Sequence, residues 1–391
     1  MTENQTEHYF DWAATSPCDK QILTESLNKT LDNWGNPSSI HTVGKDAKNL
    51  LDEARENCAK ALNVPSETLY FTSGGTESDH LALLSVLTRP SKAHVLFSSI
   101  EHPAIREMAY QMKNCGIQVE EIPCDKNGII QPETVVSMLK NNTMLVCVMA
   151  VNNETGSIQP IYKIADAIKK ACEGKRKPKF HVDAVQAAGK IPLDLNYNGI
   201  DSVAFSAHKI CGPRGIGLLY LKNPTESFLR GGGQEKGFRS GTENVFGALA
   251  LGECLKKYYI SKENTKVYER FNEQKKFCSD FIKGLKALNF CTIIPETRTE
   301  NEELFSPWIV QASFKNIPGQ VMLRALDAEG FYISTGSACS SRKNNRPVLE
   351  AMHVTKQDAE NAVRFSFGLQ TTEKAMNELL QKVSEITKKF N

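Results

Sequence analysis

Short apolar runs alternate with longer amphipathic segments over the first 260 residues of the chain. Residues 144–150 form a continuous apolar run, which is typical of a strand buried on both faces of a parallel sheet. Further strands are predicted at residues 69–72, 95–97, 119–122, 180–183, 201–206 and 216–221. Apolar residues at spacings of three and four predict helices at residues 50–62, 104–112 and 161–168, after the 73–77 turn and from Pro132. This alternation predicts an α/β domain with a mostly parallel central sheet flanked by helices, in which ligands bind at the carboxyl ends of the strands.

The pattern changes after about residue 260. A long helix is predicted over residues 262–288, followed by a strand at 309–314, a helix after Pro318, a strand at 363–367 and a C-terminal helix. Residues 9–15 are mixed in character and predict an extended arm. We therefore expect a large domain over residues 15–260 and a smaller α+β domain formed by residues 1–14 and 261–391, with a rigid interface between them.

The composition is that of an ordinary globular protein. Of the 391 residues, 40% are hydrophobic and 24% are charged, and the formal net charge is +2. Such a small net charge does not favour binding to nucleic acid or to an anionic membrane surface. No apolar run approaches the ~18 residues that a membrane span needs, and the N-terminal sequence does not resemble a secretory signal. Eleven scattered cysteines without a CxxC pair or a metal-like spacing favour a reducing cytoplasm and indicate no metal site.

Three candidate groups fall at the ends of predicted strands. Lys209 follows strand 201–206, and a desolvated lysine amine can form a Schiff base, although a solvated loop lysine is the alternative. Gly74 and Gly75 lie in a strand-to-helix turn, where free backbone N–H groups can bind an anion, although many such turns bind none. Asp183 ends a strand and can hold a protonated ring nitrogen or simply cap a helix. An amine, an anion site and a carboxylate are the groups that a pyridoxal phosphate site needs.

Short motifs are distributed over nearly the whole chain. They are Asp11 with Ala13-Ala14-Thr15, and residues 35–39 (GNPSS), 72–78 (TSGGTES), 101–102 (EH), 151–156 (VNNETG), 181–186 (HVDAVQ), 206–215 (SAHKICGPRG), 231–235 (GGGQE), 239–242 (RSGT), 337–341 (SACSS) and 364–366 (RFS). In this order they resemble the motifs of cysteine desulfurases, which are fold-type I, class V aminotransferase-like enzymes that use pyridoxal phosphate. The resemblance implies this cofactor, a homodimer, and a large domain with a mostly parallel sheet beside a smaller α+β domain.

The resemblance also implies which side chains hold the cofactor. Lys209 would carry it as a Schiff base and later move the Cα proton of the substrate. Asp183 would pair with the ring nitrogen, and Gln186 would face the phenolic oxygen. The phosphate would be held by Gly75, Thr76, Ser206 and His208, with Thr242 supplied by the partner subunit.

Four further residues are expected to act on the substrate or on the ring. His102 would stack on the ring and move protons, although it can also be a cap at a helix start. Asn153 and Arg364 would receive the substrate carboxylate, with Asn153 also contacting the cofactor, and Asn36 would contact the substrate. An arginine suits this task because its planar fork can bind both carboxylate oxygens. The alternative for Arg364 is a salt bridge on a strand surface.

Cys339 lies in a run of small polar residues that predicts an exposed loop rather than a core position. The motif resembles the family branch with a longer, mobile cysteine loop. It implies that the Cys339 thiolate attacks the sulfur of L-cysteine, takes it as a persulfide and leaves L-alanine. The sulfur would pass to an acceptor protein of iron–sulfur cluster assembly or of tRNA or cofactor thiolation. The alternative for Cys339 is an incidental exposed thiol.

The sequence departs from the family pattern in three places, and other functions stay open. Trp12 stands where Asn is usual, Gly75 where Ala is frequent, and Leu369-Gln370 where an arginine often follows. A near alternative is a selenocysteine lyase, or another class V lyase or aminotransferase, which does not strictly need Cys339. An alternative of another class is a sulfur-carrier or scaffold protein whose cofactor site is vestigial.

Overall fold

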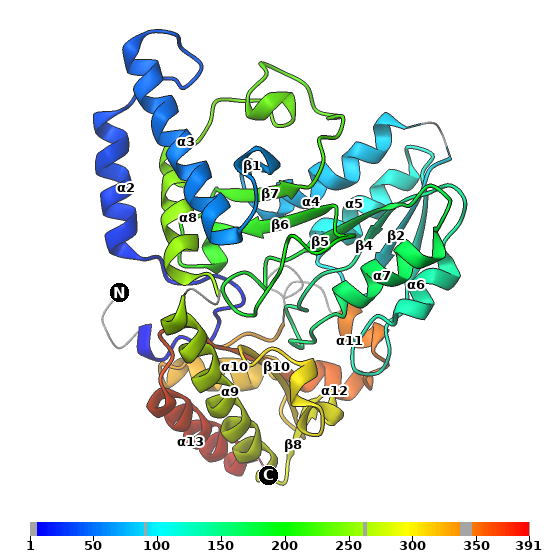
Figure 1. Ribbon diagram of the computed structural model, residues 1–391. Helices are drawn as coiled ribbons and strands as arrows, with labels where there is room; N and C mark the ends of the chain where they lie inside the picture. The colour runs from blue at the N-terminus through cyan, green and yellow to red at the C-terminus, as the bar shows by residue number, and fades with distance from the viewer. Residues whose placement is uncertain (1–5, 90–91, 261–263, 337–345, 391) are drawn as a thin grey trace.

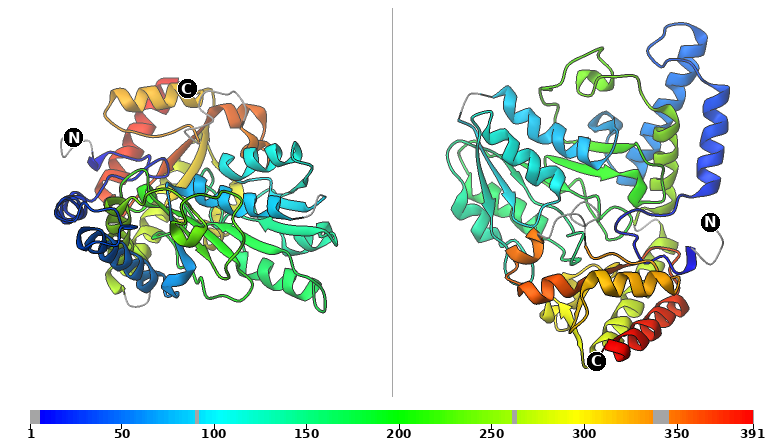
Figure 2. Two further views of the ribbon diagram at one scale, coloured as in Figure 1. Left: turned by 90° about the horizontal axis from the view of Figure 1, so that it is seen from above. Right: turned by 180° about the vertical axis from the view of Figure 1, so that it is seen from behind.

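Two β-sheets organise the chain, which the computed structural model describes at residues 6–89, 92–260, 264–336 and 346–390. The larger sheet has seven strands and the smaller has three (Figure 1). Two further views show that the smaller sheet and its helices lie on one side of the larger sheet (Figure 2). The predicted α/β architecture with a second, smaller α+β unit is confirmed.

The larger sheet is mostly parallel, as predicted. Its strands are β1 (Leu69–Thr72), β2 (His94–Ser98), β3 (Gln118–Ile122), β4 (Thr143–Cys147), β5 (Lys179–Asp183), β6 (Ser202–Ser206) and β7 (Gly217–Leu221). They are ordered β1-β7-β6-β5-β4-β2-β3, so that β3 is an edge strand. Among these strands, β7 alone runs antiparallel to its neighbours. The carboxyl ends of the other strands therefore share one edge of the sheet, where ligands of α/β folds bind.

Helices flank this sheet and connect its strands. They are α2 (Lys20–Asp32), α3 (Thr42–Leu62), α4 (Gly75–Leu84), α5 (Pro103–Lys113), α6 (Pro132–Met138), α7 (Ile161–Ala171) and α8 (Val245–Tyr258). A short 3₁₀ turn, η3 (Ala207–Lys209), follows β6. Helices α2, α3 and α8 pack side by side at the end of the sheet where β1 lies (Figure 1).

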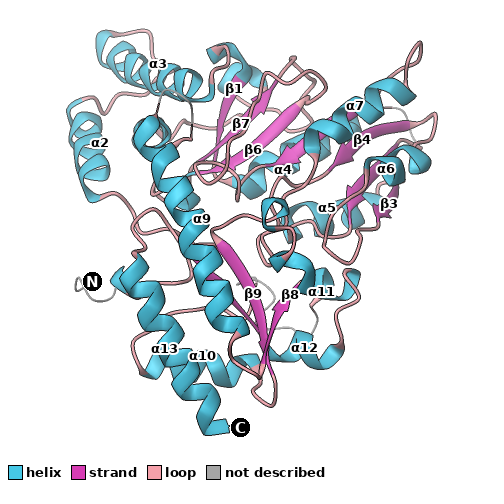
Figure 3. Ribbon diagram, turned by 60° about the horizontal axis from the view of Figure 1, so that its bottom comes forward, coloured by secondary structure: helices cyan, strands magenta, loops and turns pink. Residues whose placement is uncertain are grey.

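The smaller sheet is antiparallel, in the order β10-β9-β8. Its strands are β8 (Cys291–Ile294), β9 (Ile309–Phe314) and β10 (Ala362–Ser366). The helices of this part of the chain are α9 (Thr265–Lys286), α10 (Gly319–Ala328), α11 (Pro347–Ala351), α12 (Lys356–Asn361) and α13 (Glu373–Phe390). Figure 3 shows α9 running along this sheet, with α13 and α10 beside it. Within the residues that the structure covers, none of the helices combines the length and the apolar character that crossing a membrane requires.

The structure differs from the sequence prediction in several elements. The strand predicted at residues 144–150 ends at Cys147, where its pairing with β2 stops, and the backbone N–H of Met149 donates to the Glu101 carboxylate at 2.7 Å. Beyond Cys147, the backbone N–H groups of Val148 and Ala150 still donate to the carbonyls of His181 and Asp183. The apolar pattern does not reveal α8, which is buried on nearly every side and so has no amphipathic period. It also misses α2 and the four-residue strand β8, which are too weakly patterned to stand out.

Residues 9–15 form the predicted arm, which joins the two parts of the molecule. The backbone N–H of Ser366 on β10 donates to the Phe10 carbonyl at 2.8 Å. The Phe10 side chain is fully buried and anchors the arm in the small sheet's core. A few residues later, the backbone N–H of Ser16 donates to the His208 carbonyl, after β6 of the larger sheet, also at 2.8 Å. The arm therefore fixes the end of β10 relative to the segment that follows β6.

Trp12, which departs from the family pattern, packs against a glycine. The buried indole of Trp12 lies on Gly368, where an added Cβ would come within 2.1 Å of the ring. The guanidinium of Arg270 on α9 donates to the carbonyl of the adjacent Leu369 at 3.1 Å. Trp12 is therefore accommodated because position 368 has no side chain.

Gly368→Ala is expected to lower the free energy of unfolding by about 1–3 kcal/mol, because the methyl group overlaps the Trp12 ring. Denaturant unfolding measures this cost. In a Trp12→Ala background the obstacle is gone, so the same substitution should be nearly neutral there. An equal cost in both backgrounds would contradict the packing described here.

Candidate active site

A cavity of about 240 Å³ lies at the carboxyl ends of the parallel strands. Ten residues expected from the sequence line it: Gly75, Thr76, His102, Asn153, Asp183, Gln186, Ser206, His208, Lys209 and Arg364. Arg364 comes from β10 of the small sheet, whereas the others end or follow strands of the large sheet. The lining is completed by Ala13, Ala14, Asp79, Met149 and Val185. The cavity is therefore built by both parts of the molecule and by the arm between them.

Asp183 is the last residue of β5 and is 5% exposed. Its Oδ1 accepts a hydrogen bond from the backbone N–H of Val185 at 2.9 Å, so it also caps the following turn, as the alternative interpretation proposed. Burial raises the pKa of this carboxyl to about 8, and the charge of Asp79 acts in the same direction. Such a carboxyl is stable as an anion only beside a cation, for example a protonated ring nitrogen.

A second carboxyl and a histidine, which the sequence analysis did not identify, lie close to Asp183. Oδ1 of Asp79, on α4, is 3.1 Å from Nε2 of His181, and Nδ1 of His181 is 2.8 Å from the Ser202 hydroxyl. Burial lowers the pKa of His181 to about 4 and raises the pKa of Asp79 well above its usual range. The sequence spacing indicates Asp79, because it follows Thr76 by three residues and therefore lies on the same face of α4.

The N-terminus of α4 forms the end of the cavity that suits an anion. The N-cap residue of this helix is Gly74, which has no side chain to cap it, so the first backbone N–H groups of the helix are left for a ligand. A Cβ at Gly75 would lie 2.7 Å from Cγ2 of Val185 and 3.5 Å from Cβ of Ser206. Glycine is therefore required at this position as long as Val185 occupies the adjacent space.

Lys209, at the end of η3, is held by the arm rather than by solvent. Its Nζ donates to the carbonyl oxygens of Ala13 and Ala14, at 2.6 and 2.7 Å. The neighbouring His208 places Nδ1 3.1 Å from the Thr15 hydroxyl. Burial and the charge of Lys209 lower the pKa of His208 to about 4. The interpretation of Lys209 as a solvated loop residue is therefore wrong.

His102 caps a helix and lines the cavity at the same time. Its Nδ1 accepts from the backbone N–H of Ala104 at 3.1 Å, which caps α5 and leaves the proton of the neutral ring on Nε2. Burial lowers the pKa of His102 to about 4, and the charges of Lys209 and Arg106 act in the same direction. The ring is therefore a neutral imidazole that presents a defined tautomer.

A second buried lysine, Lys190, lies next to the cavity and was not predicted. Its Nζ donates to Oε1 of Gln186 at 2.7 Å, while Nε2 of Gln186 donates to the Ala13 carbonyl at 2.9 Å. Since the lysine is a donor and the carbonyl can only accept, these two contacts fix the orientation of the amide. Burial lowers the pKa of Lys190 to about 7, helped by the charges of Lys209 and Arg364.

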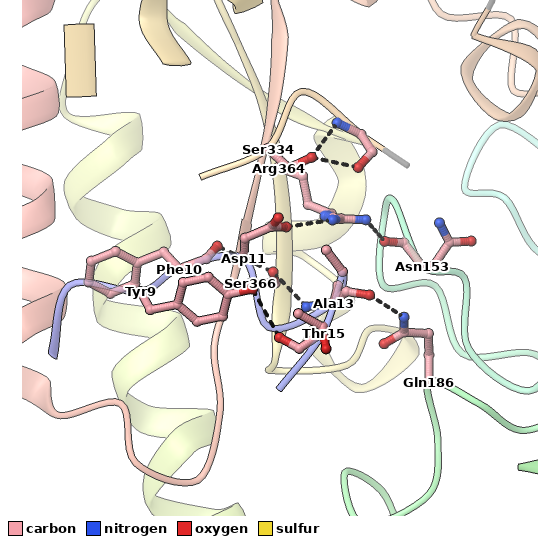
Figure 4. Close-up of polar contacts among 12 residues, drawn as sticks. Tyr9, Phe10, Asp11, Ala13, Thr15, Asn153, Gln186, Ser334, Arg364 and Ser366 are labelled. Atoms are coloured by element: carbon pink, nitrogen blue, oxygen red, sulfur yellow. Dashed lines mark hydrogen bonds and ion pairs between the residues drawn. The ribbon is translucent and has the colours of Figure 1, made fainter. Parts of the chain in front are cut away.

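Arg364 and Asn153 meet on the side of the cavity formed by the small sheet (Figure 4). The Arg364 side chain is 1% exposed. Its Nη1 donates to the Asn153 carbonyl at 2.8 Å, and its Nη2 forms an ion pair with Oδ1 of Asp11 at 2.7 Å. The salt bridge considered as an alternative for Arg364 is present, but it is part of the cavity wall rather than a strand surface.

Among the described residues, two of the predicted residues do not line this cavity. Asn36 and Thr242 are exposed and do not line it. Cys339 lies in the segment 337–345, outside the described residues.

The residues on either side of the segment 337–345 meet at Glu154. Nη2 of Arg346 lies 3.4 Å from Oε2 of Glu154, and a Cβ at Gly336 would lie 3.0 Å from the same oxygen. Glu154 directly follows Asn153, which lines the cavity. Gly336 and Arg346, which flank the segment that contains Cys339, therefore both lie beside Glu154.

Comparisons with known proteins agree over nearly the whole chain. Residues 8–379 match the family described as aminotransferase class-V. The chain is 34% identical over 390 residues to a cysteine desulfurase IscS of Dictyoglomus turgidum, which covers 98% of this chain and 95% of that protein. It is also 34% identical over 396 residues to a cysteine desulfurase IscS of Methanosarcina thermophila, which covers 100% and 94% of the two chains. A solved NifS-like protein superposes with a TM-score of 0.86 at 33% identity, covering 98% of this chain and 99% of that one.

Removal of the Asp183 carboxyl is expected to flatten the pH dependence of stability in protein prepared without a cofactor. With its pKa raised to about 8, the folded carboxyl holds a proton more tightly than the unfolded one. Its contribution is fully present below the unfolded pKa and is lost as the pH rises toward about 8. In Asp183→Asn, the free energy of unfolding should therefore decrease less over this pH range.

Urea unfolding at a series of pH values measures this slope. Glu107→Gln, at an exposed position of α5, is a control that should keep the original slope. An unchanged slope in Asp183→Asn would contradict a raised pKa for Asp183.

Proposed function

The chain belongs to the class-V aminotransferase family, and we propose that it is a pyridoxal phosphate-dependent cysteine desulfurase. It would convert L-cysteine to L-alanine and transfer the sulfur to Cys339 as a persulfide. The observation that carries this proposal is the single cavity that gathers ten of the residues expected from the sequence. Similarity over the full chain to proteins named cysteine desulfurase gives independent support.

The cavity residues fit pyridoxal phosphate, the cofactor of this family, at three points. Asp183 is a buried carboxyl with a raised pKa. A protonated ring nitrogen beside it would lower that pKa. The uncapped N-terminus of α4 suits a phosphate, and Lys209 offers a primary amine in the same cavity. Asp183 would hold the ring nitrogen, Gln186 the phenolic oxygen, Lys209 the aldehyde carbon, and Gly75, Thr76, Ser206 and His208 the phosphate.

When bound, the cofactor supplies an electron sink that weakens the bonds to the Cα atom of an amino acid. Arg364 would bind the substrate carboxylate beside Asn153, which fixes the substrate at one end. Nζ of Lys209 would take the proton from Cα, and the carbonyls of Ala13 and Ala14 would hold the resulting ammonium. The neutral ring of His102 would stack on the cofactor and keep a proton on Nε2.

The sulfur transfer needs a thiolate and no external oxidant. The sulfur of Cys339 would form a bond to the substrate sulfur while the bond from that sulfur to Cβ breaks. The electron pair of the broken bond stays with carbon, which takes up a proton and leaves as L-alanine. The thiol of Cys339 and the thiol of L-cysteine together become one persulfide, and the C–S bond of the substrate becomes a C–H bond. Support comes from Glu154, which forms an ion pair with Arg346 and lies beside Gly336, the two residues that flank the segment 337–345.

The active form is proposed to be a homodimer in which each chain completes the site of the other. The loop between α2 and α3 exposes two large apolar side chains, Trp34 at 76% and Ile40 at 90%, which a partner would cover. Asn36 belongs to the same loop. Asn36 and Thr242 would then reach the substrate and the phosphate in the partner's cavity rather than in their own.

Three further parts of the proposal concern organisation and partners. The large, cofactor-binding domain would comprise residues 15–260, and the small domain residues 1–14 and 261–391. The persulfide sulfur would pass to an acceptor protein of iron–sulfur cluster assembly or of tRNA or cofactor thiolation. A cytoplasmic location suits the ten described cysteines, which are free thiols.

After incubation with L-cysteine, the peptide that contains Cys339 is expected to gain one sulfur atom, as measured by mass spectrometry. Cys339→Ser should keep the cofactor absorbance but release no alanine, because the acceptor of the sulfur is missing. Cys115→Ser, which removes an exposed thiol outside the cavity, is the matched control and should retain activity. Undiminished alanine release by Cys339→Ser would refute the persulfide mechanism.

A further inference from the structure

We propose that Asp11 is a positioning residue, whose carboxylate orients the Arg364 guanidinium toward the carboxylate of the substrate. The inference rests on the proposed function, in which Arg364 binds that carboxylate. It assigns a task to the N-terminal arm that goes beyond joining the two domains.

Two protein oxygens hold the Arg364 guanidinium in place. Nη2 lies 2.7 Å from Oδ1 of Asp11, and Nη1 donates to the Asn153 carbonyl at 2.8 Å. Figure 4 shows the guanidinium between these two partners. A guanidinium has five N–H groups, and Nε of Arg364 is buried without a hydrogen-bond partner among the described residues. The group is therefore held in place while part of its donor set is left unsatisfied, as a site for a further carboxylate requires.

The backbone of the arm fixes the position of the Asp11 carboxylate. Asp11 forms a parallel bridge with Ser366 on β10, and the Ser366 hydroxyl accepts from the backbone N–H of Ala13 at 2.9 Å. Arg364 is two residues before Ser366 on the same strand, with its own backbone N–H bonded to the Ser334 carbonyl at 2.6 Å. Backbone hydrogen bonds therefore fix the positions of both residues of the ion pair, Asp11 and Arg364.

Charge gives a second reason for an acid at this position. The Arg364 side chain is almost fully buried, and its charge acts on the buried Lys190 together with the charge of Lys209. An isolated buried cation is costly, so a carboxylate in contact with it favours one conformation of a long and flexible side chain. Asp11 belongs to the arm, whose Ala13 carbonyl also receives the Lys209 amine. The arm thus holds the two cationic groups that the substrate meets.

The test compares two ligands of the holoenzyme that differ in the carboxylate, L-alanine and ethylamine, with dissociation constants from absorbance titrations. Asp11→Ala is expected to weaken L-alanine binding about tenfold, which is the effect of losing one charge-assisted hydrogen bond, and to leave ethylamine binding unchanged. Asp11→Asn keeps an acceptor oxygen and should stay within about threefold of the unaltered enzyme. Arg364→Ala should weaken L-alanine binding about a hundredfold.

Two more variants control for a general loss of structure. Glu378→Ala breaks the 2.9 Å contact between His8 and α13 near the arm, and should leave both dissociation constants unchanged. Asp11→Glu keeps the charge but displaces the carboxylate by one methylene, so it should weaken L-alanine binding even if Asp11→Ala does not fold.

The outcomes separate this inference from the proposed function. If Arg364→Ala weakens L-alanine binding but Asp11→Ala and Asp11→Glu do not, the role of Asp11 is refuted and the carboxylate site stands. If the Asp11 variants bind L-alanine more tightly, Asp11 is a competing counter-ion and the inference is equally refuted. If Arg364→Ala changes nothing, both the carboxylate site and the inference fail.

Discussion

Buried carboxyl groups at the end of the central strands set the main constraint on this molecule. Asp183, Asp79 and Glu101 are all buried, and burial raises the pKa values of Asp183 and Glu101 to about 8. The charge of Asp79 also raises the pKa of Asp183, and the charges of Asp183 and Asp79 raise the pKa of Glu101. Carboxyls in such an environment ionise only where a cation is supplied. A ligand with a protonated ring nitrogen meets this need at Asp183, so the electrostatics of the cavity favour the cofactor that its motifs imply.

The topology explains why these groups meet. Parallel strands place their carboxyl ends at one edge of the sheet, so residues from the ends of β1, β2, β4, β5 and β6 converge there. The arm then approaches from the small sheet. Its Ala13 carbonyl accepts from both Lys209 and Gln186, and its Asp11 contacts Arg364. The cavity thus lies between the two sheets, and its geometry depends on the packing of Phe10 and Trp12 against the smaller sheet and the residues that follow it.

The features predicted correctly from the sequence are those that local order encodes. The strand at residues 309–314 is predicted at its observed bounds, and Lys209, Asp183 and Gly75, which the sequence places at or after the ends of strands, line one cavity. The features that were missed depend on contacts between distant residues. Asp11 is 353 residues from Arg364, and nothing local marks Lys190 as the partner of Gln186. Helix α8 was missed because burial on nearly all sides removes the amphipathic pattern.

Borohydride reduction of the holoenzyme, followed by peptide mass spectrometry, tests most directly whether Lys209 holds the cofactor. Reduction converts a Schiff base into a stable secondary amine, which marks the lysine that formed it. Lys190 is the competing candidate, because its buried amine lies next to the cavity and has its pKa lowered to about 7. We predict that the phosphopyridoxyl group is found on the peptide that contains Lys209. Its presence on Lys190, or its absence from both lysines, would contradict the proposed active site.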